Sequence, residues 1–218
     1  MTVVFLDLDG TLTDAGPGIL NCVSYALEKL QLPPFEGNGS WIVGPALWPT
    51  FEKLGVSKEN LDHAVALYRE RYTDVGWLEN SLYEGVLDQL KILKDEGYTL
   101  CLATSKPHSY AKKITTFFGI SEYMTHEFGS ELDGTRSDKT SLLAYGLSVT
   151  GALAEESLMI GDRSYDVIGA KNNGIKVVGA SYGYCGDTEL ADAGADAIIS
   201  EVAELCSAVR ALLPLRDN

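Results

Sequence analysis

The sequence predicts an α/β fold in which a mainly parallel sheet core is flanked by helices and an all-helical cap domain is inserted. After about residue 81, short apolar runs alternate with helical patterns, whereas residues 15–81 hold helical patterns only. Such alternation produces right-handed βαβ units and a Rossmann-like sheet. Several of the apolar runs also end in acidic or hydroxyl residues.

Each element follows from local residue patterns. The apolar, β-branched run at residues 3–8 predicts a buried strand. Pro17 suits the first turn of a helix over residues 19–32, which stops at Pro33 and Pro34. Further helices are expected at residues 49–54, 58–72, 85–96, 109–118, 139–147, 165–173 and 202–213. Further strands are expected at residues 99–103, 157–160, 176–179 and 196–199.

These elements divide the chain into two parts. Residues 1–14 and 82–218 form the predicted α/β catalytic core, and residues 15–81 form the predicted helical cap. The cap segment holds all three tryptophans.

The composition suits a cytoplasmic globular protein. Hydrophobic residues make up 45% and charged residues 22% of the 218 residues. Neither a signal peptide nor an apolar run of the roughly 20 residues that span a bilayer is visible. The net charge of −14 repels nucleic acid and anionic membranes, so neither is an expected partner. A phosphorylated substrate would need locally concentrated positive charge.

The strongest motif is Asp7-Leu-Asp-Gly-Thr, directly after the first strand. Ligands of parallel sheets bind where strands end, and Asp7 and Asp9 project to the same side. Two carboxylates this close favour a cation between them or a shared proton. Gly10 then allows a sharp turn. A calcium loop of the EF-hand kind would need further acidic residues, which are absent.

Two weaker motifs follow. Thr104 and Ser105 end a strand just before a helix, where hydroxyl and backbone N–H groups suit either a phosphate oxygen or a helix cap. Lys139 opens another helix, where the helix dipole disfavours a positive charge. It is therefore either a point charge for phosphate or a solvated surface lysine.

The fourth motif is Gly161-Asp-Arg-Ser-Tyr-Asp after an apolar strand. Asp162, at the carboxyl end of the strand, is the better candidate for a metal ligand. Asp166 lies one helical turn later and is either an acid on the helix surface or a helix cap.

These four motifs, in this order and at the ends of successive strands, resemble the haloacid dehalogenase-like superfamily. More narrowly they resemble its phosphoglycolate phosphatase and 5′-nucleotidase branch, which carries a helical cap after the first motif. The resemblance covers essentially the whole chain. It implies a phosphoric monoester hydrolase in which Asp7 is the nucleophile and Asp9 is the general acid and base. The phosphate-binding residues that it implies are Gly10, Thr104, Ser105 and Lys139.

The resemblance also implies a Mg²⁺ ion. Its ligands would be Asp7, Asp162 and the backbone carbonyl of Asp9, with Asp166 acting indirectly through a metal-bound water or by orienting the others. Mg²⁺ prefers oxygen ligands and would screen the repulsion between a carboxylate and a phosphate. The aspartate at position 9 is similar to that of phosphatases and phosphomutases, because ion-pumping relatives have threonine there.

The cap should decide the substrate. The segment Trp41-Ile-Val-Gly-Pro-Ala-Leu47 resembles a loop that faces the catalytic site, so Trp41, Gly44 and Leu47 are expected to contact the substrate. The tryptophans stack on a nucleobase or form the core of the cap. The substrate is thus a small phosphorylated metabolite, either phosphoglycolate-like or a nucleoside 5′-monophosphate.

Two alternatives remain at this point. A phosphomutase similar to β-phosphoglucomutase would need cap cations for a second phosphate, yet residues 15–80 hold five Lys and Arg against eight Asp and Glu. A non-catalytic binding module would have lost a catalytic residue, and all of the expected ones are present. The sequence does not indicate an oligomeric state.

Overall fold

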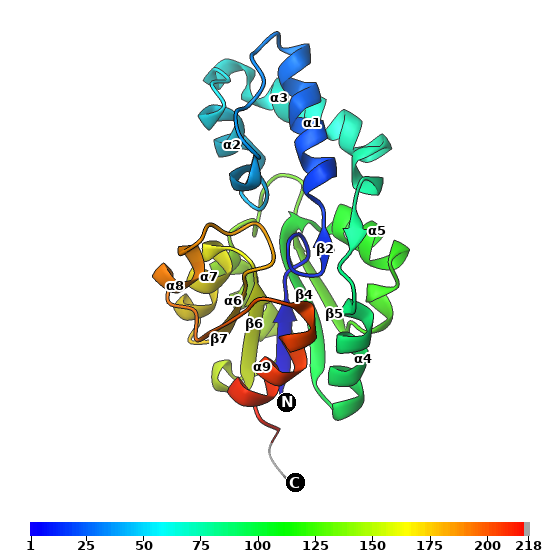
Figure 1. Cartoon of the computed structure of the whole chain (residues 1–218), viewed down its shortest axis with the longest axis vertical. Coiled ribbons are helices and arrows are strands. Elements are labelled where there is room, and N and C mark those ends of the chain that lie inside the picture. The colour runs from blue at the N-terminus through cyan, green and yellow to red at the C-terminus, as the bar shows by residue number, and fades with distance from the viewer. Residues whose placement is uncertain (216–218) are drawn as a thin grey trace.

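A computed structural model describes residues 1–215 and has two parts, a sheet covered by helices and a helical cap above one edge of that sheet (Figure 1). The predicted fold class, an α/β core with an inserted helical cap, is confirmed. Within the described residues, every helix is too short or too polar to cross a membrane.

The core is a six-stranded sheet with the order β5-β4-β1-β6-β7-β8. All of its pairings are parallel, as the alternation of strands and helices predicts. The central strand β1 pairs with β4 on one side and with β6 on the other. The strands are β1 (Val3–Leu6), β4 (Thr99–Pro107), β5 (His126–Ser130), β6 (Ser157–Gly161), β7 (Lys176–Ala180) and β8 (Ala197–Ile199).

The residues of β1 are fully buried because helices cover both faces of the sheet. Val4 and Leu6 pack on one face, against α4 (Val86–Glu96), α5 (His108–Phe117) and α9 (Leu205–Leu212). Val3 and Phe5 pack on the other, against α6 (Lys139–Thr150), α7 (Ser164–Asn172) and α8 (Glu189–Asp192). The alternation of side chains in a strand therefore builds two core layers.

The cap has a hydrophobic core of its own. Side chains of α1 (Gly16–Lys29), α2 (Leu47–Lys53) and α3 (Leu61–Asp74) form a separate buried cluster that includes Phe51 and Tyr68. The chain enters and leaves the cap side by side, because β2 (Thr13–Asp14) pairs antiparallel with β3 (Ser81–Leu82). The domain limits at residues 14/15 and 81/82 stay a prediction.

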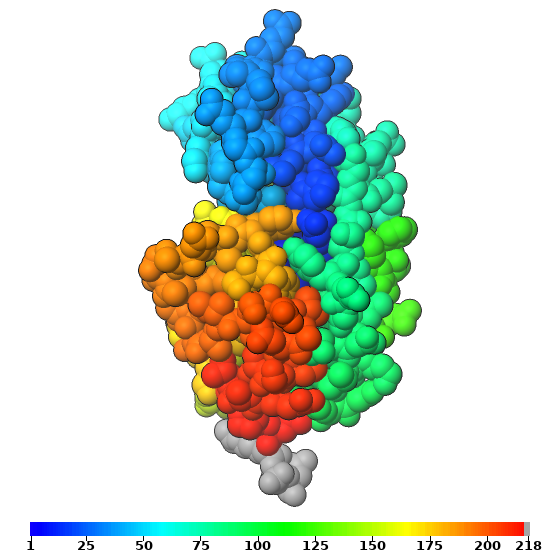
Figure 2. Space-filling model, in the orientation of Figure 1, coloured from blue at the N-terminus to red at the C-terminus, as the bar shows by residue number. Residues whose placement is uncertain are grey.

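Short 3₁₀ turns complete the described chain. They are Ser40–Ile42, Lys58–Asn60, Gly76–Leu78, Ile120–Glu122, Ala154–Glu156 and Val202–Glu204. In the space-filling view, the blue cap lies directly against orange core atoms from the segment that follows β7 (Figure 2). Tyr184 of that segment packs against the hydrophobic cluster of the cap.

Strand β5 has no counterpart among the predicted strands. Its sequence, His-Glu-Phe-Gly-Ser, is largely polar, and it lies at the edge of the sheet, where only one neighbour, β4, supplies hydrogen bonds. An edge strand tolerates polar side chains, so the apolar pattern that reveals buried strands is missing.

Candidate active site

Side chains from three adjacent strands meet at the carboxyl edge of the sheet, below the cap. Asp7 follows β1, Thr104 lies near the end of β4, and Asp162 follows β6. Because β1 lies between β4 and β6, these residues are neighbours in space although they are far apart in the sequence. The strand order thus places the predicted site at the edge where parallel sheets bind ligands.

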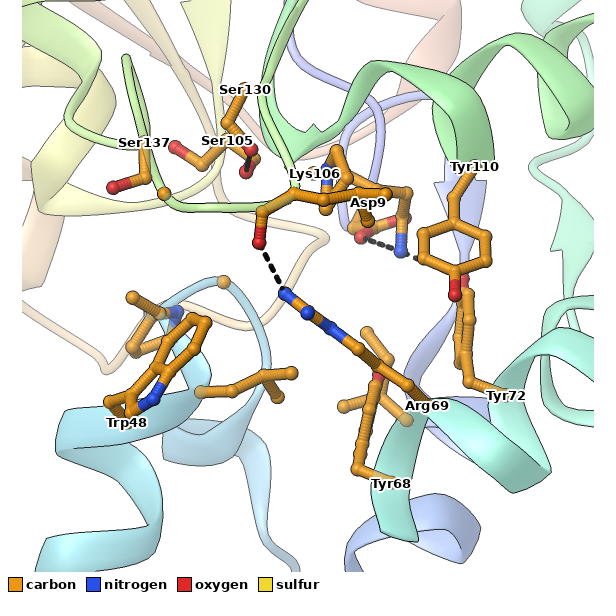
Figure 3. Close-up of a pocket in the computed structure, with 18 of the residues that line it drawn as sticks. Asp9, Trp48, Tyr68, Arg69, Tyr72, Ser105, Lys106, Tyr110, Ser130 and Ser137 are labelled. Atoms are coloured by element: carbon orange, nitrogen blue, oxygen red, sulfur yellow. Dashed lines mark hydrogen bonds and ion pairs between the residues drawn. The ribbon is translucent and has the colours of Figure 1, made fainter. Parts of the chain in front are cut away.

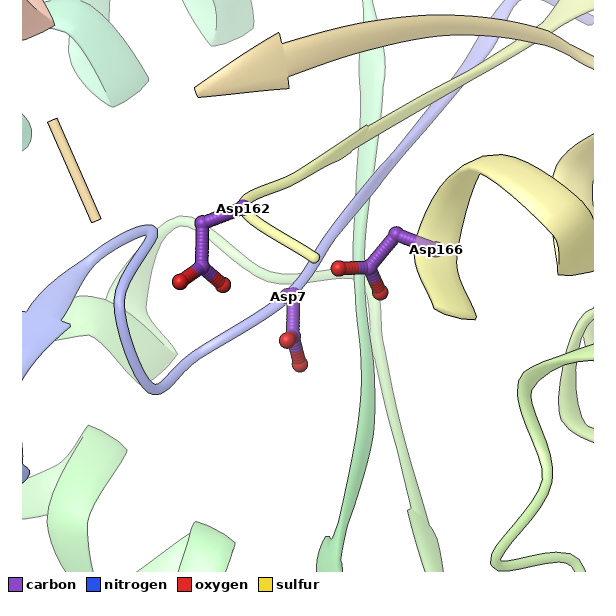
Figure 4. Close-up of side chains that lie close together, drawn as sticks. All are labelled: Asp7, Asp162 and Asp166. Atoms are coloured by element: carbon purple, nitrogen blue, oxygen red, sulfur yellow. The ribbon is translucent and has the colours of Figure 1, made fainter. Parts of the chain in front are cut away.

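Three carboxylates form the acidic part of this site (Figure 4). Oxygens of Asp7, Asp162 and Asp166 lie within 4.8 Å of one another, and all three residues are buried. Oδ2 of Asp162 accepts a hydrogen bond from the Tyr184 N–H at 2.8 Å, whereas its Oδ1 is buried with no hydrogen-bond partner in the described chain. A buried carboxylate oxygen without a hydrogen-bond partner suits a cation ligand.

Gly10 makes room for this cluster. Its φ of +84° lies in the left-handed region, and a Cβ there would come within 2.1 Å of Oδ2 of Asp162. The turn after Asp9 can therefore pass over the Asp162 carboxylate only with glycine at position 10.

Lys139 supplies positive charge to the cluster. Its Nζ lies 3.0 Å from Oδ1 of Asp7 and 2.7 Å from Oδ1 of Asp166, and it donates to the Ala103 carbonyl at 2.8 Å. Burial lowers the pKa of Lys139, but the carboxylates of Asp166 and Asp7 outweigh burial and hold that pKa above its ordinary value. Lys139 is buried and charged, so the alternative of a solvated surface lysine is wrong.

The start of helix α6 explains how a lysine is tolerated there. The N-cap residue Asp138 accepts a hydrogen bond from the Ser141 N–H at 2.9 Å. This negative charge at the N-terminus of the helix offsets the unfavourable interaction of Lys139 with the helix dipole.

Asp166 plays two structural parts at once. One of its oxygens caps helix α7 by accepting from the Arg163 N–H at 3.1 Å, and the other faces Lys139. Burial raises the pKa of Asp166 to about 6 despite the nearby Lys139. Burial and the charges of Asp166 and Asp7 also raise the pKa of Asp162 well above its usual range. Lys139 alone does not balance three buried acids, so a divalent cation fits this site.

Asp9 faces a second lysine. The Nζ of Lys106 lies 2.7 Å from Oδ2 of Asp9, and both side chains are about nine-tenths buried, at 7% and 11% exposure. Burial raises the pKa of Asp9, and Lys106 opposes that rise. The direction agrees with what a general acid requires, because the carboxyl must hold a proton near neutral pH.

A small cavity of about 30 Å³ lies between these groups. Thr104 and Ser105 line it together with Asp7 and Lys139, so three of the four predicted phosphate-binding residues surround one space, whereas Gly10 is not among its lining residues. Its further lining residues are Asp9, Gly44, Lys106, Arg163, Tyr165 and Asp166. Three cations, Lys106, Lys139 and Arg163, thus border this cavity in a chain with a net charge of −14.

A larger cavity of about 200 Å³ opens from the same place toward the cap (Figure 3). Gly44 and Leu47, which the sequence predicts to contact the substrate, line it. Trp41 does not lie among the cavity residues: it packs within the cap cluster, and the Nζ of Lys53 lies 4.0 Å from its ring centroid. Trp48, the second residue of α2, borders the cavity instead.

Four aromatic side chains border this larger cavity: Trp48, Tyr68, Tyr72 and Tyr110. Its two cations among the described residues are Lys106, which pairs with Asp9, and Arg69, which donates one N–H to the Leu132 carbonyl at 2.7 Å and has no acidic partner in the described chain. Three acids, Asp9, Glu131 and Asp133, also border the cavity and outnumber these cations. The space therefore suits a flat, uncharged group better than an anion.

Arg163 joins the cap to the core and was not predicted. Its guanidinium donates to the Val43 carbonyl of the cap and pairs with Glu189 at 3.0 Å. Arg163 follows Asp162 directly in the fourth motif, and this position beside a metal candidate is the signal that the sequence offers.

Known proteins resemble this chain over most of its length. The family model described as haloacid dehalogenase-like hydrolase matches residues 3–180. A 5′-nucleotidase of Pseudomonas aeruginosa is 39% identical over 86% of each chain. Tyrosine-protein kinase PtkA of Mycobacterium tuberculosis is 36% identical over 93% of this chain and 69% of that protein. Phosphoglycolate phosphatase 1 of Pseudomonas aeruginosa is 29% identical over 99% of this chain and 83% of that protein.

A solved structure also has a closely similar fold. The crystal structure of a predicted phosphatase from Clostridium acetobutylicum matches with a TM-score of 0.91 at 37% identity, over 97% of this chain and 99% of that one.

The chain therefore belongs to the haloacid dehalogenase-like hydrolases, as its four motifs predict. Within that family it is a phosphoric monoester hydrolase of the branch that includes phosphoglycolate phosphatases and 5′-nucleotidases.

Proposed function

We propose that this protein is a Mg²⁺-dependent phosphatase that hydrolyses nucleoside 5′-monophosphates through an aspartyl-phosphate on Asp7. The observation that carries the chemistry is the position of Asp7, which belongs to the acidic cluster, lies 3.0 Å from the Nζ of Lys139 and lines the smaller cavity. A carboxylate beside such positive charge can approach a phosphate dianion.

The reaction then has two steps. In the first, an oxygen of Asp7 forms a bond to phosphorus, the bond to the leaving oxygen breaks, and Asp9 gives that oxygen its proton. In the second, Asp9 takes a proton from water, the water oxygen bonds to phosphorus, and the Asp7 carboxylate leaves as inorganic phosphate is released. General acid and base catalysis of this kind contributes roughly 10²- to 10⁴-fold.

Mg²⁺ would be held by Asp7 and Asp162, with Asp166 beside them and the Asp9 carbonyl as a further ligand. When bound, it neutralises charge on the phosphoryl oxygens. The fit rests on the orphaned Oδ1 of Asp162 and on the excess of buried negative charge.

The phosphoryl group would lie in the smaller cavity. Thr104 and Ser105 border it from β4 and Lys139 from α6, so hydroxyl, backbone N–H and ammonium groups are available to its oxygens. Gly10 would also belong to the phosphate-binding site, because its turn leaves room beside the Asp162 carboxylate.

The larger cavity favours a nucleoside as the leaving group. Trp48 and the tyrosines offer flat apolar surfaces on which a base can stack. Glycolate would use little of the 200 Å³ space, and its carboxylate would meet Glu131 and Asp133, with Arg69 as the one lining cation without an acidic partner in the described chain. The same excess of acids over cations disfavours a phosphomutase, which must hold a second phosphate.

A substrate panel tests this proposal. Purified protein is assayed for phosphate release with the common ribonucleoside 5′-monophosphates, phosphoglycolate and β-glucose 1-phosphate, with Mg²⁺ or with EDTA. We expect release from nucleotides in Mg²⁺ only, and none from Asp7→Asn. Preference for phosphoglycolate would overturn the substrate, formation of glucose 6-phosphate would favour the mutase, and full activity in Asp7→Asn would overturn the mechanism.

A further inference from the structure

The two oxygens of Asp9 have different surroundings. Oδ2 lies 2.7 Å from the Nζ of Lys106, whereas Oδ1 is buried with no hydrogen-bond partner in the described chain. An ion pair at one oxygen fixes the rotation of a carboxylate, since a buried ammonium group holds its partner tightly. Oδ1 is therefore the oxygen whose hydrogen-bonding capacity is unused in the described chain.

Lys106 is fixed in turn by the cap. Its Nζ donates to the Tyr72 hydroxyl at 2.8 Å and lies 4.8 Å from the centroid of that ring (Figure 3). Tyr72 belongs to α3, whereas Lys106 belongs to β4 of the core. The contact thus joins the two parts of the molecule at the general acid.

Tyr72 is itself held rigidly. Its ring stacks on Tyr68 at 5.4 Å between centroids and meets the edge of Tyr110 at 5.2 Å. Tyr110 comes from core helix α5, and its hydroxyl lies 2.7 Å from the Thr73 hydroxyl of the cap. A packed aromatic group of this kind keeps the Tyr72 hydroxyl in one place.

Lys106 borders both cavities, as does Asp9. It therefore lies where the phosphoryl group and the leaving group of a substrate would join. Lys139, by contrast, pairs with Asp7 and Asp166. The two buried lysines thus serve different carboxylates.

We propose that Lys106 is a positioning residue that holds Oδ2 of Asp9, so that Oδ1 delivers the proton to the leaving oxygen, and that Tyr72 of the cap holds Lys106 in place. Asp9 is then correctly oriented only while the cap rests on the core. The inference depends on the proposed phosphatase chemistry, in which Asp9 is the general acid.

The test uses two phosphate esters of similar size and shape, p-nitrophenyl phosphate and benzyl phosphate. Nitrophenolate leaves without a proton, whereas the alcohol from benzyl phosphate needs one. The quantity compared is kcat/KM, which covers only the steps up to release of the alcohol and so omits the later role of Asp9 as a base.

We expect Lys106→Met to lower kcat/KM for benzyl phosphate by about 100-fold or more, and that for p-nitrophenyl phosphate by less than about 10-fold. Asp9→Asn should show the same selectivity. Tyr72→Phe keeps the ring and removes only the hydroxyl, so it should give a smaller loss with the same selectivity. Lys106→Arg should recover part of the loss.

Lys113→Met is the matched control. Lys113 is an exposed lysine of the core that also lies over a cap aromatic ring, 3.8 Å from the centroid of Trp77, but it is remote from both cavities. Lys113→Met should leave kcat/KM for both esters unchanged.

Equal losses for the two esters in Lys106→Met would overturn the inference, as would a change confined to KM. If wild type hydrolyses p-nitrophenyl phosphate and Asp7→Asn does not, such a result leaves the phosphatase proposal standing. If wild type hydrolyses neither ester, the proposed function itself fails.

Discussion

The ammonium group of Lys139 lies 3.0 Å from Oδ1 of Asp7, and both side chains are buried at the carboxyl edge of the sheet. The same ammonium group pairs with Asp166 at 2.7 Å. One cation thus compensates part of the charge of a cluster whose acids are too buried for water to solvate them fully. The stability of the fold and the charge of the site are therefore linked.

Replacing Lys139 by methionine should destabilise the protein. The change keeps the length of the side chain but leaves Asp7 and Asp166 without their partner, and loss of one member of a buried ion pair costs about 3–5 kcal/mol. Urea unfolding at pH 7 in EDTA measures the loss, and Mg²⁺ should restore part of it. Lys91→Met is the control, because Lys91 forms an exposed pair with Asp95 and should change stability little. Equal effects of the two changes would contradict the link.

The metal-free protein should lose stability at this site as the pH rises. Burial raises the pKa of Asp166 to about 6 from 3.8, so between these values the folded protein binds more protons than the unfolded chain. The free energy of unfolding then falls as the pH rises through about 6, by about 3 kcal/mol at roughly 1.4 kcal/mol per pKa unit.

Asp166→Asn isolates this contribution from the rest of the molecule. Urea unfolding in EDTA at pH 4.5 and pH 7, values chosen on either side of about 6, should show a smaller decline for the variant than for wild type. Identical declines would mean that Asp166 does not titrate in this range. Mg²⁺ should abolish the wild-type decline, because it stabilises the charged carboxylates.

Gly10→Ala should cost more than left-handed backbone strain alone. A Cβ at position 10 meets the Asp162 carboxylate, whereas Gly55, with a similar φ of +88°, has open space around it. Gly55→Ala should therefore lower the free energy of unfolding only by the cost of the backbone strain, about 1–2 kcal/mol. Gly10→Ala should lower the Tm more than Gly55→Ala does, and Mg²⁺ should raise the Tm of Gly10→Ala less than it raises the Tm of wild type. Thermal unfolding with and without Mg²⁺ measures both differences. Equal losses would place the Asp162 carboxylate elsewhere.

The candidate residues that the structure brings together are those whose positions follow from strand ends. Asp7 and Asp162 close apolar runs, and in a parallel sheet the ends of neighbouring strands must meet. Lys106 was missed for two reasons. The predicted strand ended at residue 103, and the register of β4 against β5 shifts between Thr104 and Pro107, so simple alternation does not place the Lys106 side chain.

Contacts between distant segments escaped prediction for a different reason. Tyr184 donates its N–H to Asp162, and its hydroxyl contacts Asp14 and Gly16 where the chain enters the cap. No periodicity or spacing in the sequence predicts such a contact, because the contact depends on how the segment after β7 folds back onto the site. The cap tryptophans present the same difficulty, since packing alone decides which ring faces the cavity.

Trp48→Ala should therefore separate the two substrate classes. Stacking of a base on an aromatic side chain contributes about 1–3 kcal/mol, which corresponds to roughly 5- to 150-fold in binding. We expect KM for a nucleoside 5′-monophosphate to rise within that range with little change in kcat, and kcat/KM for p-nitrophenyl phosphate to change far less. Trp41→Ala is the control, because Trp41 packs inside the cap cluster and not at the cavity. A larger loss of nucleotide binding in Trp41→Ala than in Trp48→Ala would show that the base stacks on Trp41 and not on Trp48.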